Sequence, residues 1–271
     1  MEKSKLKNII LAILLITNAL LLALMLYQRS ESRHYRQQTL LDALDLLSQQ
    51  GITARAEDFP DKDFPAPQLL KRDTQQELAA FSALLGQDAV HAQRGSVSLY
   101  TGSLGSAEVR GDGVFSVELA KGAYPLAEGQ DMSRHGLSVL ERMGFAARIT
   151  AVEEDVLTDV ETLNSVPIFS CAVTLRYEGG ELRAISGTRL VGVPAAEAQD
   201  EPPLSTPTLL VRFRAGVISS GDACTAVLSA AQGYILTSDA NRSHRLTPVL
   251  RLETDTNLYT LNALTGELQR A

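Results

Sequence analysis

The sequence predicts an α+β protein: an N-terminal transmembrane helix followed by repeated units of one helix and an antiparallel sheet. Three observations support this fold class. Residues 9–27 are apolar and carry no charge. Amphipathic segments at 74–85 and 132–143 are followed by runs of alternating apolar and polar residues, which is the strand period. Glycines separate those runs, as hairpin turns require. With 271 residues, 45% of them hydrophobic, the chain can bury a core in one or two domains behind the anchor.

The uncharged segment at 9–27 has the length of a membrane span. Its 19 residues extend about 28 Å as a helix, close to the thickness of the bilayer hydrocarbon. A cleaved signal peptide has a shorter apolar region and a small-x-small cleavage site, whereas this run continues through Leu24–Arg29 without one. Basic residues flank it almost equally, so the short tail at 1–8 and the large following domain favour a cytoplasmic N-terminus and an extracellular C-terminal domain.

One face of this helix carries small residues, which permit close packing with another membrane helix. Asn18 adds a polar group near the bilayer centre, where a hydrogen bond to a partner would offset its cost. The candidate partner-helix contacts are therefore Ala12, Ile16, Asn18, Ala19 and Ala23. Alanine is also common in membrane helices and one Asn is tolerated in a single span, so the contact and the plain anchor both stay open.

Residues 28–57 follow as a juxtamembrane helix and a short extended segment. Leu40, Ala43, Leu44 and Leu47 share one face, which predicts packing, and Gly51 is a natural helix end. Residues 58–73 form a proline-rich linker that is incompatible with a helix.

The first α+β unit of the ectodomain spans 74–192. Its first helix is expected over 74–85 with Thr74 as N-cap and Gly86 as stop, and its second over 132–143. Strands are expected at 96–101, 105–110, 114–119, 145–153, 156–163, 168–177 and 181–191. A second linker, 193–207, holds four prolines. The C-terminal unit, 208–271, begins with a segment at 208–219 that suits a helix better than a strand, and strands follow at 224–237, 245–254 and 257–263.

Composition and motifs argue against several functions. The net charge of −7, the absence of Trp and the lack of a basic patch oppose nucleic-acid binding. No metal-binding His pair, nucleophile elbow or phosphate-binding loop occurs in the sequence. We therefore expect no catalytic residues, no metal and no cofactor, and a protein that is not an enzyme.

Three smaller features have structural explanations. The Arg110-Gly111-Asp112 triplet lies where a hairpin turns, and Asp-Gly is a preferred turn pair. The acidic cluster at 153–155 with Asp159 and Glu161 lacks the pattern of a calcium loop and is expected to be a solvated hairpin. Cys171, in an apolar run, is expected to be a buried free thiol, although a disulfide with Cys224 is compatible with an exported domain.

The C-terminal residues carry a family resemblance. Pro248–Leu252 and Leu258–Leu268, with Asn262-Ala263-Leu264-Thr265-Gly266-Glu267, resemble the last two strands and turn of PepSY-like domains, although Leu250 replaces the usual aromatic residue. In this turn Gly266 supplies a positive φ. The N-terminal Met1–Ile10, the single span, the leucine-rich helix, Gly51-Ile52 and the proline linker together resemble the YycI (WalI) family, across the whole chain in architecture.

The resemblance implies a membrane-anchored regulator without catalytic residues. YycI-like proteins act with a YycH-like partner on the sensor histidine kinase of the YycFG (WalKR) two-component system, which governs cell-wall metabolism. An alternative from another class is a PepSY-type inhibitor or chaperone of an exported peptidase or cell-wall hydrolase, for which a soluble fragment from about residue 58 would suffice. An anchored hydrolase is a third hypothesis and would require a deep cleft with converging acids.

Overall fold

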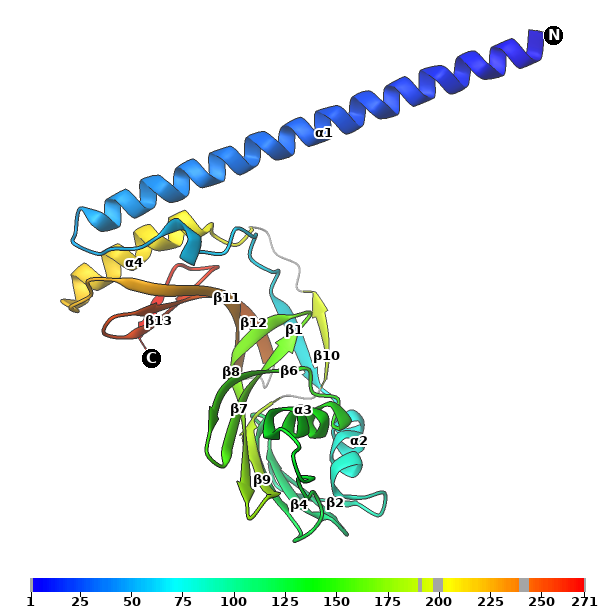
Figure 1. Ribbon diagram of the computed structural model, residues 1–271, viewed down its shortest axis with the longest axis vertical. Helices are drawn as coiled ribbons and strands as arrows, with labels where there is room; N and C mark the ends of the chain where they lie inside the picture. The colour runs from blue at the N-terminus through cyan, green and yellow to red at the C-terminus, as the bar shows by residue number, and fades with distance from the viewer. Residues whose placement is uncertain (1, 190–191, 197–201, 239–243, 271) are drawn as a thin grey trace.

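A long helix projects from a two-lobed α+β body in the computed structural model of the protein (Figure 1). The structure describes residues 2–189, 192–196, 202–238 and 244–270, without side chains at 2–12, 23–24, 26–33, 193, 196 and 238. Helix α1 (Glu2–Ser48) runs unbroken through the predicted span and the juxtamembrane segment. It ends before Gly51, as predicted, where φ is 78°.

The first lobe is an antiparallel sheet covered on one face by two helices. Asp73, rather than the expected Thr74, caps the first helix, because its carboxylate accepts hydrogen bonds from the backbone N–H groups of Gln75 and Gln76. The sheet order is β2-β3-β4-β5-β9-β8-β7-β6. The elements are α2 (Thr74–Leu85), β2 (Val90–Arg94), β3 (Val97–Gly102), β4 (Gly105–Arg110), β5 (Val114–Leu119), α3 (Met132–Arg142), β6 (Ala147–Glu153), β7 (Val156–Leu163), β8 (Val166–Glu178) and β9 (Glu181–Thr188).

The second lobe repeats this arrangement with one helix and four strands. Its elements are α4 (Thr206–Ser220), β11 (Val227–Ser238), β12 (His244–Thr254), β13 (Leu258–Asn262) and β14 (Leu268–Arg270), with the strands paired in chain order. The segment at 208–219 is therefore a helix, which Ser205 caps. Buried Leu209, Leu210 and Phe213 of α4 pack on Leu250 and Leu252 of the sheet. Figure 1 shows no helix on the opposite face of this sheet among the described residues.

The junction between the lobes uses segments that the sequence assigned to linkers. Strand β1 (Gln68–Arg72) lies within the expected linker 58–73, and β10 (Gly192–Ala196) overlaps the expected linker 193–207. The two strands pair with each other, and β1 also pairs with β12. Strand β11 meets β8 in a parallel bridge at Tyr234 and Ile168, so the two sheets are continuous. Both linker assignments were thus partly wrong, because strand pairing over more than 100 residues leaves no local signal.

Both predicted turns are confirmed. Gly113 follows Asp112 between β4 and β5 with φ 88°, and its N–H donates to the carbonyl of Arg110. Between β13 and β14, the side-chain oxygen of Asn262 accepts hydrogen bonds from two backbone N–H groups, and Gly266 adopts φ 74°. These residues build turns, as their types predict.

Candidate functional site

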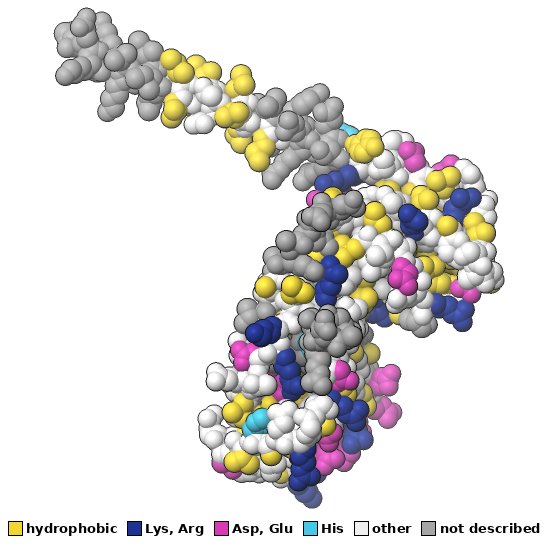
Figure 2. Space-filling view, turned by 180° about the vertical axis from the view of Figure 1, so that it is seen from behind, with side chains coloured by type: hydrophobic (Ala, Val, Ile, Leu, Met, Phe, Trp, Pro, Cys, Tyr) yellow, Lys and Arg dark blue, Asp and Glu magenta, His cyan; other side chains and the backbone are white. Residues whose placement is uncertain are grey.

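Helix α1 presents apolar side chains that are exposed among the residues the structure describes. Ile13, Ile16 and Leu20 are each about 60% exposed, and Figure 2 shows hydrophobic side chains along the described part of the projecting helix. Of the candidate partner contacts, Ile16, Asn18 and Ala19 are exposed, whereas the side chains of Ala12 and Ala23 lie outside the described residues. The predicted span at 9–27 falls partly on such residues. Among the residues described, no helix combines the length and apolar character needed to cross a membrane.

The other end of α1 is built into the core of the second lobe. Ala43 and Leu47 are buried with Phe213 of α4 in one cluster, and Leu40 and Leu44 pack against it. This confirms the predicted apolar face. Ile52 also belongs to the cluster, and Thr53 exchanges backbone hydrogen bonds with Thr225 and Val227. A fragment from residue 58 would therefore lack Ala43, Leu47 and Ile52 of this core.

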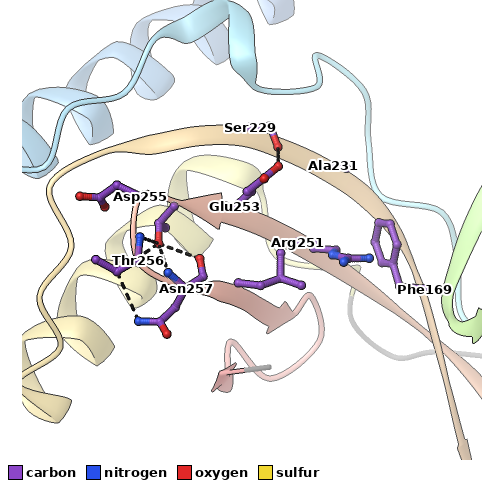
Figure 3. A pocket seen from close by; sticks show the side chains of 10 residues that line it. Phe169, Ser229, Ala231, Arg251, Glu253, Asp255, Thr256 and Asn257 are labelled. Atoms are coloured by element: carbon purple, nitrogen blue, oxygen red, sulfur yellow. Dashed lines mark hydrogen bonds between the residues drawn. The ribbon is translucent and has the colours of Figure 1, made fainter. Parts of the chain in front are cut away.

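A pocket of about 500 Å³ lies on the free face of the second sheet (Figure 3). Leu250 and Leu252 point toward α4, so alternation places Arg251 and Glu253 on the opposite face. Ser229 and Ala231 of β11 sit across from Glu253 and Arg251. Phe169 of β8, from the first lobe, closes one end of the pocket. The pocket is therefore lined mainly by the second lobe, with one residue from the first.

The charged groups of the pocket are held in different ways. The Arg251 guanidinium carbon lies 4.9 Å from the centre of the Phe169 ring, a cation–π contact. The Glu253 carboxylate accepts a hydrogen bond of 2.9 Å from the Ser229 hydroxyl. The Asp255 carboxylate accepts hydrogen bonds from the Thr225 hydroxyl and from the backbone N–H groups of Thr225 and Ala226, and these bonds hold its pKa below the usual range. Arg251 and Glu253 therefore keep more unused hydrogen-bonding capacity than Asp255 does.

The expectation of a solvated acidic hairpin was wrong for two of its residues. Glu153, Glu154 and Asp155 are exposed at the β6–β7 turn, but Asp159 is fully buried, and neither of its oxygens has a hydrogen-bond partner in the described structure. Burial raises its pKa to about 6. Glu161 is mostly buried and pairs with Arg189 at 2.8 Å. Asp159 and Glu161 alternate with Leu157 along the strand and therefore point inward with it. This alternation was visible in the sequence, but the charge of the two residues led to the prediction that they are solvated.

Arg189 joins this ion pair to the end of helix α3. Its guanidinium donates to the backbone carbonyl of Gly144 and lies 3.4 Å over the Phe145 ring. Burial lowers the pKa of Arg189, and the ion pair with Glu161 partly offsets this shift by raising the pKa. A charged side chain at this position caps carbonyls that the helix leaves unpaired. The role of this cluster is structural.

A second buried ion pair fixes β1 to the first lobe. Arg72 donates two hydrogen bonds of 2.7 Å to the carboxylate of Glu77 on α2, which also accepts one of 2.6 Å from the Tyr100 hydroxyl. Glu77 is 1% exposed, and burial is the main cause that raises the pKa of Tyr100. The bidentate geometry satisfies both carboxylate oxygens. This ion pair also has a structural role, and no motif in the sequence predicted the pairing.

Both cysteines are free and buried, which confirms the expectation for Cys171. Burial raises the pKa of the Cys171 thiol to about 12, so it is unreactive at neutral pH. In the described residues, no group of three or more His, Cys, Asp or Glu is arranged to hold a metal.

Comparisons with known proteins place the chain in no family. No model of a known protein family matches it, and a search of curated proteins gave no match. Among solved structures, it is similar to an uncharacterized protein from Eubacterium rectale ATCC 33656, with 10% identity and a TM-score of 0.47, covering 78% of this chain and 86% of that one. It is also similar to the Bacillus megaterium YpeB C-terminal domain, with 14% identity and a TM-score of 0.36, covering 74% of this chain and 98% of that one. The fold is plainly α+β, and these distant likenesses assign no function.

Proposed function

We propose that the chain is a single-pass membrane protein that regulates a sensor histidine kinase without being an enzyme. Residues 9–27 serve as the anchor, the N-terminus is cytoplasmic and the body lies outside the cell. In this proposal the chain is a YycI-like protein that acts with a YycH-like partner on a kinase controlling cell-wall metabolism. The N-terminal and C-terminal resemblances support this choice, together with the exposed apolar side chains of α1.

The continuity of α1 is the observation that carries the proposal. An α-helix of 47 residues is about 70 Å long, and the far end of this helix is fixed in the second-lobe core through Leu47. A rotation or shift of the membrane segment therefore reaches the body without a hinge. Regulation then requires only that α1 contact two kinase states with different affinity. Ala19 and Ala23 permit close helix approach, and Asn18 can hydrogen-bond within the bilayer.

Substitutions in the span test the contact with the kinase. Asn18→Leu removes an interhelical hydrogen bond worth about 0.6–2 kcal/mol, which changes the balance of kinase states roughly threefold to thirtyfold. Ala19→Leu with Ala23→Leu adds bulk to the small-residue face. Ile13→Phe with Leu24→Phe adds bulk to a third face, away from both Asn18 and the small-residue face, and is the matched control. Kinase output from a reporter promoter is measured at equal protein levels. Wild-type output from both test variants would count against the proposal.

Alanine insertions between Ser30 and Glu31 test the mechanical connection. One inserted residue turns the anchor by about 100° relative to the body, whereas four turn it by only about 40°. We expect one or two insertions to alter kinase output and four to restore most of it. Output that is insensitive to all insertions would show that α1 is only a tether.

The open sheet face favours the second candidate, an ectodomain that binds an exported peptidase or cell-wall hydrolase. The two proposals differ in what they require of the anchor. Replacing residues 9–27 by leucines of equal number keeps a membrane span but removes Asn18 and the small-residue face. The kinase proposal expects regulation to be lost in this variant, whereas ectodomain binding expects it to persist.

A further inference from the structure

Arg251 is held differently from two other arginines of the protein, Arg72 and Arg189. Arg72 and Arg189 pair with carboxylates, and each of those ion pairs joins separate elements. Arg251 is half-buried in the pocket and stacks on Phe169, but no oxygen of the described residues accepts a hydrogen bond from it. Its planar fork of N–H donors matches a carboxylate. The stacking holds that fork in place before any ligand arrives.

The opposite charge of the pocket is held apart from Arg251. Glu253 lies two residues further along β12, about 7 Å at the rise of a strand, and the two do not form an ion pair. Figure 3 shows the Arg251 side chain reaching toward Phe169, while Glu253 turns toward Ser229. The Arg251 guanidinium and the Glu253 carboxylate therefore line the same pocket at two separate positions. A ligand with both charges, spaced slightly more widely than 7 Å, complements this arrangement.

We propose that the pocket binds a short peptide of about three residues by its two charged ends. Its C-terminal carboxylate binds the Arg251 guanidinium, and its N-terminal ammonium group binds Glu253. An extended chain spans about 3.3–3.6 Å per residue, so three residues bridge the two charges. The volume of about 500 Å³ lies within the range of small-ligand pockets. This inference goes beyond the proposed function and does not depend on the membrane span or on the kinase.

Calorimetric titration of the full chain in detergent tests the proposal with three probes. We expect tri-alanine to bind, and its C-terminal amide and N-acetyl forms to bind more weakly because each lacks one charge. Arg251→Gln and Glu253→Gln should each weaken tri-alanine binding roughly 10- to 100-fold, since each removes a charged hydrogen bond. Arg110→Gln, which changes an exposed strand arginine of the first lobe, is the matched control and should bind as wild type.

Two further comparisons separate recognition from folding. Arg251→Lys keeps the positive charge but lacks the planar N–H donors of the guanidinium. This variant should bind tri-alanine more tightly than Arg251→Gln but more weakly than wild type. Glu253 is exposed, so Glu253→Gln reports on the site even if an Arg251 variant fails to fold. The proposal is overturned if tri-alanine does not bind the wild-type chain, or if the amide and acetyl forms bind as tightly as tri-alanine. Kinase output in the anchor variants is unaffected by either result, so the two proposals fail separately.

Discussion

Leu47 fixes the end of α1 to the second lobe, and its truncation measures the strength of that connection. The side chain is fully buried among Ala43, Ile52 and Phe213. Replacing a buried leucine by alanine removes its transfer free energy and leaves a cavity, which costs about 2–5 kcal/mol. Leu41, six residues earlier on the same helix, is 52% exposed. Leu41→Ala keeps the same chemistry and should change the unfolding free energy by less than about 0.5 kcal/mol.

Hydrogen exchange followed by mass spectrometry on the full chain resolves this effect by region. For amides of β12 and β13 that exchange through unfolding of the lobe, Leu47→Ala should accelerate exchange roughly 30-fold to a few thousand-fold. Amides of β4 and β5, in the separate core of the first lobe, should change far less. Equal exchange in wild type and Leu47→Ala, or an equal effect of Leu41→Ala, would refute the proposed attachment of α1.

Three further predictions concern residues of the first lobe. The pKa of Asp159, raised by burial to about 6 from 3.8, means that its contribution to stability is fully present below pH 3.8 and is lost as pH rises through 6. Asp159→Asn should therefore raise the unfolding free energy by up to about 3 kcal/mol at pH 7.5 and little at pH 4 in urea titrations; an equal gain at both pH values would contradict this. Gly187→Ala should destabilise the β8–β9 pairing by about 1–3 kcal/mol in thermal unfolding, because its Cβ would overlap the backbone carbonyl of Ala172, whereas exposed Ser186→Ala should be neutral. Cys171 should react with a maleimide only after denaturation in guanidinium, and rapid native labelling would show that its site opens.

Local features of the chain were predicted well. Helix α2, the strands at 105–110, 114–119 and 156–163, and the Asp-Gly turn were placed with the bounds that the structure has. Each depends on a repeat or turn signal within a few neighbouring residues. The apolar face ending in Leu47 was also recognised. Its partner, α4, was not, because helix periodicity shows that a face is buried but not what buries it.

The pocket was not predicted, although the sequence shows the charged and aromatic residues that line it. Arg251 and Glu253 belong to one strand, but Phe169 comes from the other lobe, 82 positions before Arg251. The buried acids were misjudged for a related reason. Charged residues are usually solvated, and only the sheet that encloses Asp159 and the proximity of Glu161 to Arg189 reversed that expectation.

The sequence by itself determined the uncharged segment at 9–27, the helices and turns, and the α+β class, because backbone preferences and hydrophobic periodicity act over a few residues. Only the tertiary structure decided that β1 and β10 pair across the junction, that α1 is fixed to α4, and that Arg251 faces Phe169. Those contacts join residues far apart in the chain. Their free energy comes from burial and hydrogen bonds that exist only once both partners are folded, so no local pattern records them.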